Sequence, residues 1–112
     1  MRLHSEVGLR HSKTSDLNSH FAAAIVTELV MAAESRAPDA IRGLETVRLD
    51  ASRRGFVWWD LESRLHLGEI ELRSGKLVAA RTRLEQLQSD AHRKGFLLIA
   101  RKAATALGQS LH

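Results

Sequence analysis

The chain has 112 residues and a formal net charge of +4, which leaves room for one small domain with a modest core. It contains no cysteine, which excludes disulfides and thiolate metal sites and suits a reducing compartment, so we expect a cytoplasmic protein. The longest apolar run, residues 21–26, is far too short to span a bilayer, and the N-terminus lacks the apolar segment of a signal peptide.

The first residues, 1–14, are polar and show no periodicity, so we predict a flexible N-terminal tail followed by one domain over residues 15–112. Ser15 or Asp16 can cap the first helix, along which apolar residues recur at helical spacing. Pro38 suits the first turn of a second helix. The apolar face of that helix comprises Ala40, Leu44, Val47 and Ala51.

The third helix, predicted over about residues 56–73, carries two apolar stripes, as expected for a helix with neighbours on two sides. The first stripe comprises Val57, Leu61, Leu65, Gly68 and Leu72. The second comprises Trp59, Leu67 and Ile70, with Ser63 between them. One polar band between the stripes comprises Glu62, His66, Glu69 and Arg73. The other comprises Asp60, Arg64 and Glu71, in which Asp60 and Arg64 stand at pairing distance.

The fourth helix, predicted over residues 76–94, has a single stripe and should therefore cover the outside of a layer. That stripe comprises Leu77, Ala80, Leu84, Leu87 and Ala91. The fifth helix, predicted over residues 96–110, again has two stripes. One comprises Phe96, Ala100, Ala103, Leu107 and Leu111, and the other comprises Leu98, Ile99 and Ala106. Gly55, Gly75 and Gly95 follow the second, third and fourth helices and are expected to end them.

The sequence contains an internal repeat: residues 44–72 align with residues 84–112, 40 positions later, with nine identical pairs. A fixed period in this range is typical of stacked helical repeats. The short connections make consecutive helices antiparallel neighbours. The predicted order is therefore inner, outer, inner, outer, inner, which amounts to two hairpins and a final single helix.

Residues 64–87 resemble a tetratricopeptide repeat. The match comprises Leu67-Gly68, Gly75, Leu77, Ala80, Leu84 and Leu87 at the spacings of that motif. Arg64 and Glu71 stand where the motif has aromatic residues, and Thr27-Glu28 stand where an earlier copy should have Leu-Gly. The 40-residue period resembles the longer variant of this repeat found in bacterial signalling proteins and large transcription activators. The resemblance covers roughly residues 16–111 and implies an all-α superhelix of antiparallel helical hairpins, with five helices in about two and a half repeats.

In that family the inner helices line a concave groove that binds a peptide or protein partner. The contacts implied for this chain are Glu62, His66, Glu69 and Arg73 on the third helix and Lys102 and Gln109 on the fifth. The resemblance therefore implies a non-catalytic protein–protein interaction module, within a larger bacterial signalling or regulatory protein or on its own. Trp59 is a further candidate contact, because an exposed tryptophan is a natural interface anchor. We expect one of Trp58 and Trp59 in the core and the other at the groove edge, with two half-buried residues as the open alternative.

No catalytic or metal site is predicted. Glu62, His66 and Glu69 share one helical face and are ligand types, but the fifth helix offers no further carboxylate or histidine before His112. No nucleophile, oxyanion hole or phosphate-binding loop is recognisable. We therefore expect neither an enzyme nor a cofactor.

Nucleic-acid binding is the alternative function. Arg53, Arg54, Arg93 and Lys94 recur one repeat apart and could form a basic ladder that neutralises phosphates. Each pair of cations also suits the negative end of its own helix, and acidic residues are interleaved along the chain, so the ladder is the less favoured reading.

A homodimer is expected through the C-terminal end. The stripe of Leu98, Ile99 and Ala106 has no encoded outer neighbour, and a terminal repeat normally has a polar outer face. Burying this stripe against a second copy would satisfy both chains. Cover by residues 1–14, or by further protein in the native chain, remains open as a rival.

Overall fold

The computed structural model describes the backbone of residues 2–109 and the side chains of residues 14–108. Within that part of the chain all regular elements are α-helices: α1 (Arg2–Ala33), α2 (Ala37–Arg53), α3 (Val57–Arg73), α4 (Leu77–Arg93) and α5 (Leu97–Gln109). The predicted all-α class and the number of helices are confirmed.

The first helix begins earlier than the sequence predicted. It includes residues 2–14, for which no regular structure was expected, so Ser15 and Asp16 lie inside α1 and do not cap it. The flexibility predicted for this stretch stays a prediction.

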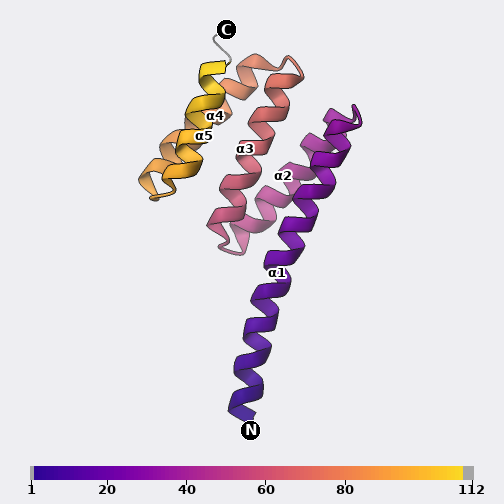
Figure 1. Ribbon diagram of the computed structural model, residues 1–112, viewed down its shortest axis with the longest axis vertical. Coiled ribbons are helices and arrows are strands. Elements are labelled where there is room, and N and C mark those ends of the chain that lie inside the picture. The colour runs from indigo at the N-terminus through magenta and orange to yellow at the C-terminus, as the bar shows by residue number, and fades with distance from the viewer. Residues whose placement is uncertain (1, 110–112) are drawn as a thin grey trace.

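The helices stack as antiparallel hairpins. Each helix packs against the next one in the chain, and α3 also contacts α1 and α5. The helices α1, α3 and α5 therefore form one layer and α2 and α4 the other, which is the predicted alternation (Figure 1).

All four connections use one turn geometry. In the second, the N–H of Gly55 donates to the carbonyl of Ser52 at 3.1 Å and the N–H of Phe56 donates to the carbonyl of Ala51 at 2.9 Å. This pair of bonds ends a helix when the first of the two donor residues, here Gly55, has a positive φ. Residues with positive φ recur at 20-residue intervals, at Ser35, Gly55, Gly75 and Gly95. The 40-residue period is therefore one hairpin of two equal helix-turn units.

Two clusters of buried apolar residues form the core, and α3 contributes to both. Its Leu61 and Leu65 pack with α4 and α5, whereas its Leu67 and Ile70 pack with α1 and α2. The two predicted stripes of α3 thus correspond to its two sets of neighbours, except at Val57, which is the first residue of α3 and is 37% exposed.

The outer helices have the predicted phase, with one exception. Leu84 is fully buried whereas Val78 is 81% exposed, so the apolar stripe of α4 faces α3 and α5. Leu77 was predicted in the same stripe but is 49% exposed. It is the first residue of α4 and lies in the row of exposed residues that follows the turn.

The second stripe predicted on α5 is wrong. Ile99 and Ala106 are buried in the same cluster as Ala103, whereas Leu98 is 56% exposed. Ile99 and Ala106 are seven residues apart, which is close to two turns, so they share one broad inward arc with Ala103. The expected self-association stripe therefore has only Leu98 on the surface.

Candidate functional site

A groove of about 390 Å³ lies between α3 and α5 in the inner layer. Its α3 wall comprises Glu62, Leu65, His66 and Glu69, and its α5 wall comprises Arg101, Lys102, Thr105 and Ala106. The apolar stripes of α3 are occupied by packing on either side, so the polar band between them is left to line this groove. We refer to it as the inner groove.

His66 lies at the centre of the α3 wall and binds a carboxylate through each ring nitrogen. Its Nε2 is 3.2 Å from Oε1 of Glu62, and its Nδ1 is 3.3 Å from Oε1 of Glu69. Both nitrogens must carry a hydrogen to donate to both acceptors, which makes the ring a cation. The hydrogen bonds to Glu62 and then to Glu69 outweigh burial and raise the pKa of His66 to about 9.

This arrangement determines what the histidine can do. A ring that donates through both nitrogens has no lone pair for a metal or for accepting a proton at neutral pH. Across the residues that the structure describes, no group of His, Asp and Glu is placed to hold a metal ion.

Glu62 is the deepest polar group of the inner groove. Its side chain is 18% exposed, and its Oε2 is buried without a hydrogen-bond partner among the described residues. The hydrogen bond from His66 lowers the pKa of Glu62, against the effect of burial, and the charge of Lys102 across the groove lowers it further. Glu62 therefore stays ionised, with one buried oxygen that has no hydrogen-bond partner among the described residues.

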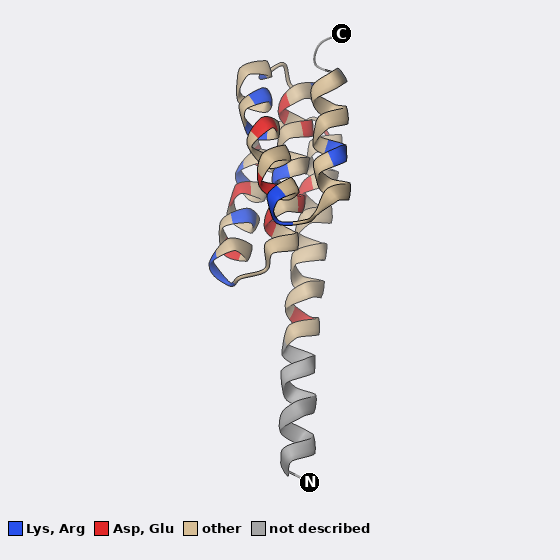
Figure 2. Ribbon diagram, turned by 90° about the vertical axis from the view of Figure 1, so that its left-hand side faces the viewer, with Lys and Arg blue, Asp and Glu red and all other residues tan. Residues whose placement is uncertain are grey.

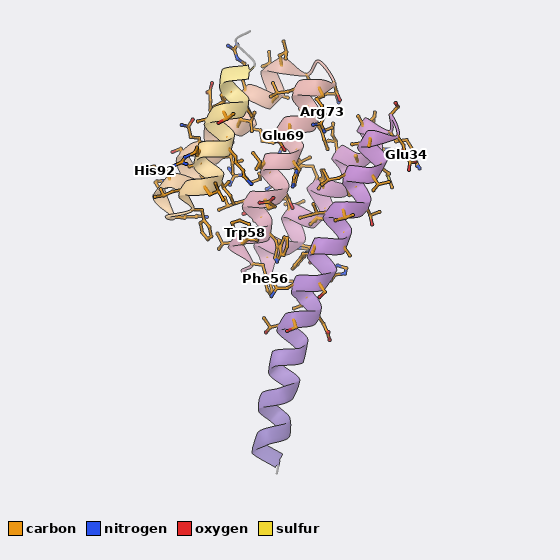
Figure 3. The ribbon with its side chains drawn as sticks, in the orientation of Figure 1. Glu34, Phe56, Trp58, Glu69, Arg73 and His92 are labelled. Carbon is orange, nitrogen blue, oxygen red and sulfur yellow. The ribbon has the colours of Figure 1, made fainter. Side chains whose placement is uncertain are left out.

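Four of the predicted partner contacts converge on this groove: Glu62, His66, Glu69 and Lys102. Arg73 does not line it, because it is the last residue of α3 and projects at the end of that helix, one turn beyond Glu69 (Figure 3). The side chain of Gln109 lies outside the described residues.

Trp59 was the candidate for an exposed contact, but Trp58 is the more exposed of the two tryptophans. Trp59 packs against the core cluster that α3 forms with α1 and α2, and its Nε1–H donates to Oδ1 of Asn18 on α1 at 2.8 Å. Trp58 is 40% exposed beside Phe96, with the two ring centroids 6.1 Å apart (Figure 3). Trp59 thus connects α3 to α1, and Trp58 is the one with a free surface.

The second polar band of α3 forms long-range ion pairs that the sequence did not predict. Nη2 of Arg64 lies 2.8 Å from Oδ2 of Asp90 on α4, so the expected pairing with Asp60 is wrong. Glu71 is buried and accepts from Nε of Arg83 on α4 at 2.7 Å. Arg64 and Glu71 stand where the resemblance drawn from the sequence would have aromatic residues, and here both form charged contacts to α4. That substitution was visible in the sequence, but the partners were not.

Arg83 also connects the two outer helices. Its Nη2 lies 2.6 Å from Oε1 of Glu45 on α2, and Glu45 in turn accepts from Arg48 at 2.9 Å. The bonds to Glu71 and Glu45 outweigh burial and raise the pKa of Arg83 further. This cluster connects α2, α3 and α4 through charged contacts.

Arg53, Arg54 and Arg93 at the helix ends pair with aspartates nearby, whereas no ion pair involves the side chain of Lys94 among the described residues. Nε of Arg54 lies 2.9 Å from Oδ1 of Asp50, and Arg53 lies 3.8 Å from the same atom. One repeat later, Arg93 pairs with Asp90. Figure 2 shows Lys and Arg interleaved with Asp and Glu over the stack rather than gathered into one track. This pattern favours helix-end stabilisation over a phosphate-binding ladder.

None of the helices in the described part of the chain combines the length and apolar character needed to cross a membrane. In comparisons with known proteins, no family model matches this chain, and no curated protein or solved structure matches it significantly.

Proposed function

We propose that this chain is a non-catalytic protein-interaction module of tetratricopeptide-like hairpins that binds a peptide or protein segment in the inner groove. The observation that carries the proposal is the convergence of Glu62, His66 and Glu69 from one helix with Lys102 from another on a single groove. The resemblance of the sequence to a tetratricopeptide repeat implies the same four side chains as partner contacts. A rigid repeat scaffold supplies such a surface without having to order a loop.

The charges of the groove favour a particular ligand chemistry. His66 is already paired with both carboxylates of α3. The cations left on the walls are Arg101 and Lys102 of α5, and Lys102 faces the half-buried Glu62. We propose an extended peptide that lies in the inner groove and places a carboxylate at Lys102. A cytoplasmic setting, within or beside a bacterial signalling or regulatory protein, is part of the same proposal.

Selection from a random-peptide display library tests the proposal. Peptides enriched on the wild-type chain should carry acidic residues and should lose about tenfold or more in affinity for Lys102→Glu. Lys76→Glu is the matched control, because Lys76 is also exposed but lies at the start of α4, away from the groove. Failure to enrich any peptide, or equal binding to both variants, would contradict the proposal.

Nucleic-acid binding is less supported, because Arg53, Arg54 and Arg93 already pair with aspartates. The same protein can be titrated with duplex DNA and single-stranded RNA at several salt concentrations. Affinity that falls steeply with salt and disappears in Arg53→Ala/Arg93→Ala would favour this alternative over peptide binding.

A further inference from the structure

A second groove, of about 550 Å³, lies between α4 and α5 at the C-terminal end of the stack. Its lining includes Glu85 and His92 from α4 and Leu97, Ala100, Arg101 and Ala104 from α5. His92 marks its position in Figure 3. It is distinct from the inner groove, although Arg101 borders both. We refer to it as the end groove.

The internal repeat shows what kind of surface this is. Glu85 and Arg101 correspond, 40 residues earlier, to Glu45 and Leu61. In the first repeat both of these residues contact α4. Glu45 receives Arg83 from α4 at 2.6 Å, and Leu61 is fully buried in one cluster with Leu84 and Leu87 of α4. The end groove is thus the place in the repeat where another helix packs.

Two features of the end groove specify the charges of its occupant. Glu85 keeps the acidic group that Arg83 binds in the earlier repeat, so an occupant must bring a cation to it. Arg101 replaces the buried Leu61, so an occupant must also bring an anion. Neither side chain forms a hydrogen bond or an ion pair with another described residue.

We propose that a second copy of this chain fills the end groove across a two-fold axis, with Glu85 of each copy facing Arg101 of the other. The groove demands one cation and one anion, and a copy of the same groove supplies both. An isologous interface of this kind pairs each residue twice.

The apolar part of the end groove fits the same arrangement. Leu97 is 59% exposed, whereas Ala100 and Ala104 follow it on the same wall and are small. When the axis passes beside residues 100 and 101, antiparallel packing of α5 on its copy sets Leu97 of one chain over Ala104 of the other. Small residues on the facing helix permit that close approach. This interface differs from the stripe of Leu98, Ile99 and Ala106 expected from sequence.

Sedimentation velocity on charge-reversed variants tests the pairing. The wild-type chain should shift from monomer to dimer as its concentration rises into the high micromolar range. Glu85→Arg alone opposes two arginines across the axis, and Arg101→Glu alone opposes two glutamates, so each variant should remain monomeric. An equimolar mixture of the two restores both attractive pairs, so it should form a heterodimer.

The mixture distinguishes this proposal from a pair formed within one chain, which mixing cannot restore. Glu34→Arg and Arg81→Glu are the matched controls, since both residues are exposed and lie outside the groove, and both variants should dimerise. A wild-type monomer at high micromolar concentration would overturn the proposal. Dimerisation of both single variants, or monomers in the mixture, would overturn it as well.

The milder variants Glu85→Gln and Arg101→Gln keep the test decisive if circular dichroism shows that a charge reversal unfolds the chain. Each should raise the dissociation constant of the dimer by about tenfold. An unchanged dissociation constant would overturn the proposal. The readout is mass, so the result is independent of whether the inner groove binds a peptide.

Discussion

A methyl group added at Gly68 of α3 would lie 2.5 Å from Cδ2 of Leu84 on α4. Leu84 is fully buried, so it has no free space into which it could withdraw. The contact between α3 and α4 thus depends on a missing side chain on one helix and a large one on the other. A methyl group added at Gly43 of α2 would also meet a side chain of the neighbouring helix, but there it is the carboxyl group of Glu28 on α1.

We expect Gly68→Ala to lower the free energy of unfolding by about 1–3 kcal/mol, because the added methyl overpacks a rigid contact. This cost should exceed the gain of about 1 kcal/mol from the better helix propensity of alanine. Gly43→Ala should be neutral or stabilising, since the carboxyl of Glu28 ends a flexible side chain and can move. Urea unfolding of the two variants measures the difference, and equal losses would show that the α3–α4 contact is not the tighter one.

Leu84→Ala and Leu65→Ala should each destabilise by roughly 2–5 kcal/mol, the usual cost of truncating a buried leucine. Both side chains belong to the cluster between α3, α4 and α5, with 0% and 2% exposure. Val78→Ala is the matched control on α4, because Val78 is 81% exposed and should cost less than about 0.5 kcal/mol. Comparable losses at Val78 and Leu84, measured by chemical denaturation, would contradict the observed phase of α4.

Much of the fold could be predicted because helical periodicity reports the direction of a side chain from its own helix. The stripe of α2 is buried as expected, and the two stripes of α3 are buried or half-buried except at Val57. The glycines that follow α2, α3 and α4 adopt the positive φ that ends a helix. Glu62, His66 and Glu69 of the first polar band face the inner groove for the same reason, whereas Arg73 does not. Periodicity does not show how wide the buried face of a helix is. Ile99 was therefore assigned to a second, outer stripe of α5, although it is buried in the same cluster as Ala103.

Partners across helices could not be predicted, because they depend on how two helices pack. Arg64 pairs with Asp90, 26 positions away, in preference to Asp60 on its own helix. Trp59 donates to Asn18, 41 positions away. Nothing along α3 alone distinguishes a polar residue that meets a charge on a neighbour from one that meets water. The tetratricopeptide-like family and the peptide partner stay predictions.

The stability of the chain should depend on pH through His66. Its pKa is about 9 in the folded chain against 6.5 for the unperturbed group, so the folded state holds the proton more tightly. The contribution of this pairing is therefore complete below about pH 6.5 and is lost as the pH rises through 9. We expect a loss on the order of 1–3 kcal/mol across this window, since one pKa unit corresponds to about 1.4 kcal/mol.

Urea unfolding at intervals between those two pH values measures the loss, and NMR titration of the imidazole gives the pKa of His66 directly. In His66→Gln the dependence within this window should be much reduced. Wild-type stability that stays level from pH 6.5 to 9, or an imidazole that titrates near 6.5, would show that Glu62 and Glu69 do not hold the proton.

Removing one partner of the Glu71–Arg83 ion pair should lower the free energy of unfolding strongly, whereas replacing both partners with apolar residues should lower it little. The side chain of Glu71 is only 6% exposed, so Arg83→Ala leaves a buried carboxylate without its partner and should cost about 3–5 kcal/mol. Glu71→Ala should cost less, because Arg83 keeps its contact with Glu45. Arg81→Ala, on an exposed part of α4, is the matched control and should have almost no effect on stability.

The double variant Glu71→Leu/Arg83→Met should recover most of the loss, since apolar side chains of similar volume need no charge partner. A double variant as unstable as Arg83→Ala alone, in a denaturation cycle, would mean that Arg83 stabilises the stack through Glu45 and not through Glu71.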